Sequence, residues 1–303
     1  MSSRSASLLS RWGGLAMVAG LMAAALAAPG AVAAIAIPEG KGQFAFRDAK
    51  GHGGRDLTVY TYRPSRCDAR CPIQIVLHGV SRNASGYRDY WSEAAERHGF
   101  VVVAPLFSRE SWGGASAYNR GGVEATDDRS RWAFAVIEHL FDEIADGRKD
   151  YRLFGHSAGA QFVHRFLYFV PDNRASQAIA ANAGWYTLPE WRKARAAHPW
   201  PHSLVDAKVG EREARRALGQ PLTILLGESD TDPNASDLDR QPGSLAQGAH
   251  RLARGKQFHR VAEALAREQG VPFGWTVATV PGVGHSGVKM AKAAADMLYG
   301  AVK

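Results

Sequence analysis

The sequence predicts a doubly wound α/β domain, with a mostly parallel sheet and helices on both of its faces. Short, almost continuously apolar runs at residues 73–77 and 101–104 are typical of strands that are buried on both sides of a parallel sheet. Between them, residues 87–98 carry apolar side chains at helical spacing and end at Gly99, which completes one βαβ unit. The chain has 303 residues and is 46% apolar, which is enough material for a large core.

The other elements follow the same alternation, which indicates one domain over residues 35–303. Alternating polar and apolar residues at 43–47 and 56–63 predict two half-exposed antiparallel strands before the parallel units. The pattern then predicts strands at residues 151–154, 178–181, 222–226 and 275–280, and helices at residues 132–144, 157–169, 250–268 and 287–301.

Residues 185–220 interrupt this alternation with a stretch that is rich in Trp, Pro, His and Arg. Two interpretations fit it equally. It is either a lid or pocket-wall insertion, or a surface excursion with one ordinary helix near residues 211–218.

The N-terminal segment has the pattern of a secretory signal peptide. Two arginines precede an uncharged apolar run at residues 13–28, and small residues then fit a cleavage site near Ala33 or Ala34. An uncleaved membrane anchor is the alternative, but a run of 16 Ala-rich residues is short for a membrane span. We therefore expect residues 1–34 to be removed and the remaining chain to be secreted or periplasmic, without a membrane span.

Composition argues against several classes of partner. The formal net charge is +8, but the basic residues are dispersed and form no patch with interleaved aromatics, so we expect no nucleic-acid partner.

Acidic residues after the strand at 222–226 resemble the start of a calcium loop, but Ala235 stands where the loop requires Gly, and Gln241 stands where it requires the bidentate Glu. We therefore expect no metal, and the serine chemistry described below predicts no cofactor.

Cys67 and Cys71 are the two cysteines of the chain, and three residues separate them just before a predicted strand. In an exported protein this spacing indicates a small disulfide clip. Two free thiols remain the alternative, because so short a loop closes only with suitable turn geometry.

The strongest chemical signal is Gly155-His156-Ser157-Ala158-Gly159, a G-x-S-x-G element between a predicted strand and a predicted helix. A serine nucleophile must project from a tight strand-to-helix turn, where a Cβ on the flanking glycines would collide with neighbouring backbone. The pentapeptide also occurs by chance in Gly-rich sequences. Here strand, turn and helix agree, so Ser157 is the candidate nucleophile.

A serine nucleophile needs a base and a carboxylate that orients the base, in the chain order Ser, Asp or Glu, His. His285 lies in a Gly-rich loop between the last strand and the last helix and is the candidate base. The loop after the strand at 222–226 offers Asp230, our choice, with Asp232 as competitor and Glu228 as a third option.

Acyl transfer also requires N–H donors for an oxyanion. The backbone N–H of Ala158 follows the nucleophile directly, and Val80, in the loop after the strand at 73–77, is the second candidate donor. Aromatic residues in loops at predicted strand ends are candidates for the substrate wall, although each could equally pack in the core. Trp185 is favoured among them because it closely follows the strand at 178–181. The full set is Trp112, Tyr118, Trp185, Tyr186 and Trp200.

Four motifs occur together and in this chain order: His78-Gly79, Gly155-His156-Ser157-Ala158-Gly159, Gly227-Glu228-Ser229-Asp230 and Gly284-His285. Their combination resembles the α/β-hydrolase superfamily and, within it, the polyhydroxyalkanoate-depolymerase-like and feruloyl-esterase-like secreted esterases. The resemblance implies the roles of nucleophile, acid and base for Ser157, Asp230 and His285, and it supports the two oxyanion donors named above.

These observations predict an exported serine hydrolase that cleaves carboxylic esters, small or polymeric, through an acyl-enzyme on Ser157. A peptidase or amidase of the same fold uses the same machinery, and a catalytically silent envelope binding module is the alternative from another class. The sequence leaves the acyl-chain length and the oligomeric state open.

Overall fold

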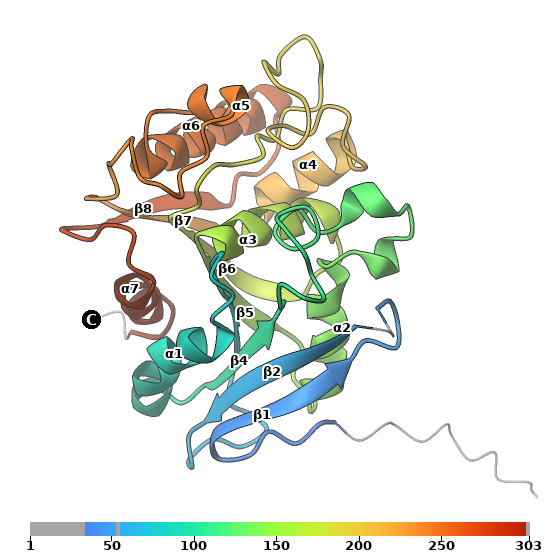
Figure 1. Ribbon diagram of the computed structural model, residues 1–303, viewed down its shortest axis with the longest axis vertical. Coiled ribbons are helices and arrows are strands. Elements are labelled where there is room, and N and C mark those ends of the chain that lie inside the picture. The colour runs from blue at the N-terminus through green and yellow to red at the C-terminus, as the bar shows by residue number, and fades with distance from the viewer. Residues whose placement is uncertain (1–33, 53–54, 301–303) are drawn as a thin grey trace, which may run out of the picture. The chain divides into compact units, whose positions relative to one another are not determined.

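The computed structural model describes residues 34–52 and 55–300. In this part of the chain, eight strands form one sheet in the order β1-β2-β4-β3-β5-β6-β7-β8, with helices on both faces (Figure 1). The predicted doubly wound, mostly parallel fold is therefore confirmed. The predicted signal peptide lies outside the described residues, apart from its last position.

The strands agree closely with the sequence pattern. β2 pairs antiparallel with both β1 and β4, whereas β4, β3, β5, β6, β7 and β8 are all parallel to one another. Their bounds are β1 Gly40–Arg47, β2 Asp56–Arg63, β3 Ile73–Leu77, β4 Val101–Leu106, β5 Tyr151–His156, β6 Ala175–Ala181, β7 Leu222–Gly227 and β8 Trp275–Val280.

The helices differ from prediction where they are short. Periodicity missed α5 and two 3-10 turns, η1 and η2, because each has fewer residues than the pattern needs. The helix predicted from residue 132 begins at Ala135, because Trp132 ends η2 with extended backbone. The bounds are α1 Ala84–His98, η1 Val123–Ala125, η2 Arg129–Arg131, α2 Ala135–Ile144, α3 Ala158–Phe169, α4 Glu211–Gly219, α5 Pro242–Leu245, α6 Arg251–Gln269 and α7 Gly287–Tyr299.

Local chemistry explains where α1 starts and stops. The side chain of Asn83 accepts a hydrogen bond from the Gly86 N–H at 3.0 Å, which caps the first turn. At the other end Gly99 has φ of 75°, a left-handed conformation that glycine adopts without a side-chain clash. The predicted boundary at Gly99 is therefore correct.

Two separate cores cover the two faces of the sheet. Trp91 of α1 and Met290 of α7 are fully buried against one face. Phe162 of α3 and Phe258 of α6 are fully buried against the other, together with side chains of α2 and α4. Among the helices of the described residues, none combines the length and the apolar character needed to cross a bilayer.

The strand order reverses direction between β3 and β5, which are neighbours in the sheet. The chain leaves β3 toward α1 on one face and leaves β5 toward α3 on the other. Because the two connections diverge, they open a crevice at the carboxyl ends of these strands, where ligands of open α/β sheets bind.

The stretch at residues 185–220 is largely irregular and packs on α3. An isolated bridge pairs Leu188 with Ser203, and α4 then forms close to the helix expected at 211–218. Arg165 of α3 is fully buried beneath this stretch, where its guanidinium donates to the Thr187 hydroxyl at 2.8 Å. Its function as a lid or pocket wall stays a prediction.

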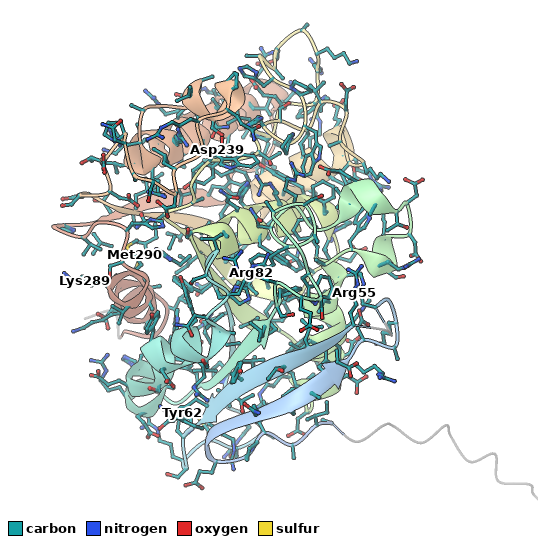
Figure 2. All side chains as sticks on the ribbon, in the orientation of Figure 1. Arg55, Tyr62, Arg82, Asp239, Lys289 and Met290 are labelled. Carbon is teal, nitrogen blue, oxygen red and sulfur yellow. A yellow bond between two sulfur atoms is a disulfide. The ribbon has the colours of Figure 1, made fainter. Side chains whose placement is uncertain are left out.

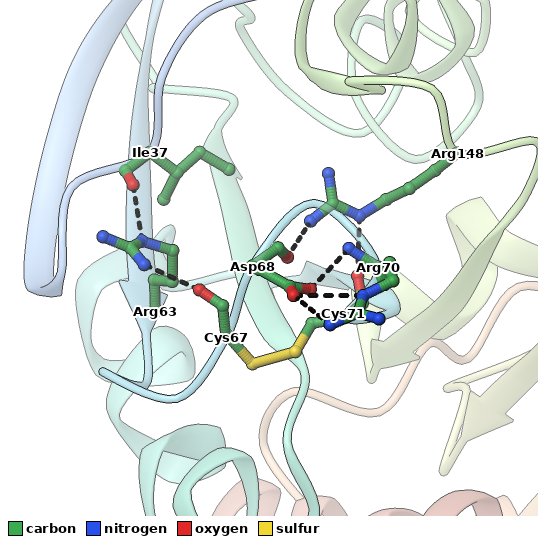
Figure 3. Close-up of a disulfide and its surroundings, with 7 residues drawn as sticks. All are labelled: Ile37, Arg63, Cys67, Asp68, Arg70, Cys71 and Arg148. Atoms are coloured by element: carbon green, nitrogen blue, oxygen red, sulfur yellow. Dashed lines mark hydrogen bonds and ion pairs between the residues drawn. A yellow bond between two sulfur atoms is a disulfide. The ribbon is translucent and has the colours of Figure 1, made fainter.

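A disulfide joins Cys67 and Cys71, whose Cα atoms are 5.5 Å apart (Figure 3). Two arginines hold the short loop that it closes. Arg63 donates to the Cys67 carbonyl at 2.7 Å, and Arg148 donates to the carbonyls of Cys71 at 2.6 Å and Asp68 at 3.0 Å. The clip therefore docks on β2 and on the segment before β5.

Two fully buried histidines act as hydrogen-bond acceptors in the core. Nε2 of His78 accepts from the Phe107 N–H at 3.1 Å, and Nε2 of His164 accepts from the Thr187 N–H at 3.0 Å. Accepting requires a free lone pair, so both imidazoles must be neutral. Burial lowers the pKa of His78 to about 4 and lowers that of His164 as well.

We expect the free energy of unfolding to fall as the pH drops from 6.5 toward 4. In that window the unfolded histidines bind protons and the folded ones do not, so protonation favours the unfolded state. For His78 alone the loss at pH 5 is about 2 kcal/mol, given the usual His pKa of about 6.5. Urea unfolding at pH 7.5 and pH 5.0 measures it. His78→Gln, which keeps an acceptor but does not titrate, should lose less over the same interval, and equal losses would contradict the assignment.

Candidate active site

Ser157 occupies a strained turn between β5 and α3. Its φ of 57° and ψ of −116° lie outside the regions that non-glycine residues prefer. A Cβ on Gly155 would lie 2.2 Å from the Gly159 carbonyl oxygen, and a Cβ on Gly159 would lie 2.3 Å from the Leu77 oxygen. Both glycines are therefore required by close backbone contacts, as the sequence pattern predicts.

Three loops at the carboxyl edge of the sheet bring a serine, a histidine and an aspartate together. The Ser157 Oγ lies 3.0 Å from His285 Nε2, and His285 Nδ1 lies 2.8 Å from Asp230 Oδ2. With the imidazole proton on Nδ1, His285 donates to Asp230 and accepts from the Ser157 hydroxyl. Groups in this arrangement can act as a nucleophile, a base and a carboxylate that orients the base.

The geometry separates the three acidic candidates. Asp230 is only 5% exposed and faces His285, whereas Asp232 is exposed and accepts from the Asn234 N–H at 2.8 Å. Glu228 is exposed and accepts from the Thr279 hydroxyl of β8 at 2.8 Å. Asp232 thus caps its own loop, and Asp230 is the carboxylate next to the imidazole.

The two candidate oxyanion donors line the same cavity as Ser157, which has a volume of about 390 Å³. Ala158 is the first residue of α3, so its N–H has no partner within the helix. The Val80 carbonyl accepts from Arg109 at 2.7 Å, which joins its loop to the segment after β4. Arg82 donates to the carbonyl of Gly113 at 2.8 Å and so joins the two loops that border the cavity.

The aromatic candidates divide between the cavity and the core. Trp185 lines the cavity, and Tyr118 borders it from within the core, where its buried hydroxyl donates to the His78 carbonyl at 2.8 Å. Trp112 does not, because its ring packs in the core against Phe107. The expectation for two further rings also needs correction. Tyr186 is fully buried and stacks on Phe258 of α6, and Trp200 packs edge-on against Phe169 of α3.

Charged side chains border much of the cavity. Arg82 and Arg109 come from the segments after β3 and β4, and Asp237 and Asp239 come from the segment between β7 and α5. Figure 2 shows Arg82 near the middle of the view and Asp239 near its top. The border of the cavity therefore carries charged groups of both signs.

Two positioning residues were missed in the sequence. Asn182, directly after β6, donates to the Gly284 carbonyl at 3.1 Å and accepts from the Gly227 N–H at 2.8 Å, so it joins the loops that carry His285 and Asp230. Arg251, the first residue of α6, has its Nη1 3.5 Å from Asp230 Oδ1. Asn182 could have been identified as a site residue, because it directly follows a predicted strand. Arg251 lies in a predicted helix, and nothing in the helical pattern marks it as a site residue.

A neutral pair, His156 and Tyr87, lies beside His285. The ring of His156 is 4.6 Å from that of His285, and its Nδ1 is 2.7 Å from the Tyr87 hydroxyl. Burial lowers the pKa of His156 and raises the pKa of Tyr87, so both groups are uncharged near neutral pH. The pair therefore places no charge against this face of His285.

Two solved structures are similar to most of the chain. Poly(aspartic acid) hydrolase-1 from Sphingomonas sp. KT-1 is 38% identical with a TM-score of 0.81, over 87% of this chain and 100% of that one. A poly(3-hydroxybutyrate) depolymerase from Bordetella parapertussis is 35% identical with a TM-score of 0.80, over 86% of this chain and 89% of that one. No protein-family model and no curated protein matches the chain.

We expect Gly159→Ala to destabilise the protein by about 1–3 kcal/mol or more, because the added Cβ would overlap the carbonyl of Leu77. The urea concentration at half-unfolding measures the loss. Gly114→Ala is the matched control, since no heavy atom lies within 4 Å of the Cβ it would add. Unchanged stability of the Gly159 variant would show that α3 does not rest on β3 as described.

Proposed function

The chain belongs to the α/β-hydrolase family of esterases, and from this we propose that it cleaves carboxylic esters through an acyl-enzyme formed on Ser157. The hydrogen-bonded chain from Ser157 through His285 to Asp230, at the edge of a cavity, is the observation that carries the proposal. The similarity to a protein named as a poly(3-hydroxybutyrate) depolymerase supports the proposal, because poly(3-hydroxybutyrate) is a polyester.

In the first half of the reaction, His285 Nε2 takes the hydroxyl proton while Ser157 Oγ attacks the ester carbonyl. Asp230 holds the Nδ1–H and stabilises the imidazolium that forms. The negative charge on the carbonyl oxygen is stabilised by the N–H groups of Ala158 and Val80. The bond to the alcohol then breaks, and the alcohol oxygen takes the proton from Nε2.

In the second half, water replaces the alcohol beside His285. The imidazole takes a proton from the water as it attacks the acyl carbonyl, the same two N–H groups hold the oxyanion, and Ser157 leaves with the proton from Nε2. These steps use side chains, backbone and water, so the proposal includes no cofactor.

The charged border of the cavity supports short, polar acyl groups as substrates. Arg82 and Arg109 line it, and their guanidinium groups donate to the neutral backbone carbonyls of Gly113 and Val80. Small esters and the ends of a polyester both fit this description, and we propose no choice between them.

Amide bonds are a second candidate. Poly(aspartic acid) hydrolase-1, which is 38% identical to this chain, is named for a polymer whose units are joined by amide bonds. The same nucleophile and base serve esters and amides, so the fold does not separate them. A catalytically silent binding module would keep the fold but would not react with an active-site fluorophosphonate.

We also propose that the protein is exported. The pattern of residues 1–34 supports a signal peptide, and the disulfide between Cys67 and Cys71 is of the kind found in oxidising compartments.

Ser157→Ala should lower esterase turnover by at least about 10³-fold, because it removes the nucleophile. Initial rates on p-nitrophenyl esters from acetate to palmitate and clearing of a polyester emulsion measure it, with labelling by a fluorophosphonate as a second readout. We expect the highest rates on the short chains. Retained turnover in a folded Ser157→Ala protein would contradict the mechanism.

Asp230→Asn should lower kcat by a factor on the order of 10³ to 10⁴, because the imidazole loses its orienting carboxylate. Asp232→Asn is the matched control and should change kcat by less than about twofold, since the exposed side chain caps only its own loop. The opposite ranking of the two variants would move the role of the acid to Asp232.

A further inference from the structure

We propose that Asp237 accepts a hydrogen bond from the leaving group and so favours scissile bonds whose leaving atom carries a hydrogen, amides above all. This inference rests on the proposed function, because it assigns a specificity-determining residue to the same site. Under this proposal, the Asp237 side chain determines whether the site prefers amides or esters.

The position of the carboxylate is the first observation. Asp237 lies on the segment between β7 and α5 and lines the cavity that holds Ser157. Its Oδ2 is 3.9 Å from His285 Nε2, the nitrogen that lies 3.0 Å from Ser157 Oγ. The leaving atom takes its proton from Nε2 and so must come close to it, in a position from which a hydrogen on that atom can reach Oδ2.

A buried guanidinium is the second observation. Arg251 Nη2 is 2.7 Å from Asp237 Oδ1, and the arginine side chain is only 3% exposed. One oxygen of Asp237 is thus occupied by Arg251 while the other lies on the His285 side. The same guanidinium faces Asp230, so one arginine sets the position of Asp237 relative to the reacting groups.

Asp237 is ionised near neutral pH. Partial burial raises the pKa of its carboxyl, but the hydrogen bond and charge of Arg251, with the charge of His285, outweigh this and hold the pKa below its usual value. An ionised carboxylate is a strong hydrogen-bond acceptor and has no proton to donate. It therefore distinguishes leaving atoms that carry a hydrogen from those that do not.

The chemistry of amide cleavage supplies that hydrogen. When the tetrahedral intermediate collapses, the C–N bond breaks, its electron pair stays on nitrogen, and the carbonyl double bond re-forms. The nitrogen lone pair takes the proton from His285 Nε2, so the N–H that the amide already carried must point elsewhere. Asp237 Oδ2 accepts that N–H and receives no proton. An ester oxygen carries no hydrogen and gains nothing from this contact.

The test compares one acyl group on two leaving groups. The full chain and Asp237→Ala are assayed with p-nitrophenyl butyrate and with N-(4-nitrophenyl)butanamide, whose leaving nitrogen carries a hydrogen. We expect Asp237→Ala to lower kcat/KM for the anilide by roughly 10- to 100-fold more than for the ester, the range expected when a hydrogen bond to a charged group is lost.

Asp239→Ala is the matched control. It removes the same charge from the same cavity, but the Asp239 carboxylate accepts from the Gln241 N–H at 2.9 Å. In this variant kcat/KM should change by the same factor for both substrates. The ratio of kcat/KM for the anilide to kcat/KM for the ester should therefore equal that of the unchanged chain.

Two outcomes overturn the inference. Equal losses on ester and anilide in Asp237→Ala would mean that the carboxylate acts on the His285 imidazolium and not on the leaving group. Turnover of the ester without measurable turnover of the anilide by the unchanged chain would also overturn it. Absence of fluorophosphonate labelling at Ser157 would instead reject the proposed function, so the two failures are distinguishable.

Discussion

The site depends on one close backbone approach, in which the turn between β5 and α3 rests directly on the end of β3. Gly159 leaves no space for a Cβ next to the Leu77 carbonyl, and the strained Ser157 is held by a hydrogen bond from its N–H to the Ala181 carbonyl at 2.9 Å. This packing places the serine next to the loop that carries Val80. Because β3 and β5 lead to helices on opposite faces, the crevice between their loops stays open above the contact.

The surroundings of His285 divide into a neutral side and a charged side. The uncharged ring of His156 packs against the imidazole, while Asp230 and Asp237 approach its two nitrogens. Arg251 lies between the two carboxylates and limits their mutual repulsion. The His285 imidazole therefore has charged neighbours on the carboxylate side only, and the single buried guanidinium of Arg251 contacts both of those carboxylates.

Most of the fold could be predicted from the sequence, because strands and helices of about five residues or more show a pattern of apolar side chains in the residues themselves. The parallel strands were found by their apolar runs, and α1 was found with its end at Gly99. The short α5 and the two 3-10 turns were not predicted, since so few residues leave no period to detect. The start of α2 was misplaced for a related reason, because Trp132 is apolar and buried but belongs to the preceding turn.

The sequence by itself determined the candidate nucleophile and its glycines, because a strained strand-to-helix turn restricts residue type within five consecutive positions. It also narrowed the base and the acid to loops after particular strands, since chain order limits which loops meet at one sheet edge. Only the tertiary structure decided between Asp230 and Asp232, moved Trp112 and Tyr186 from the cavity wall into the core, and brought Arg251 and Asp237 to His285. Those assignments rest on distances between residues far apart in the chain, which no local pattern records.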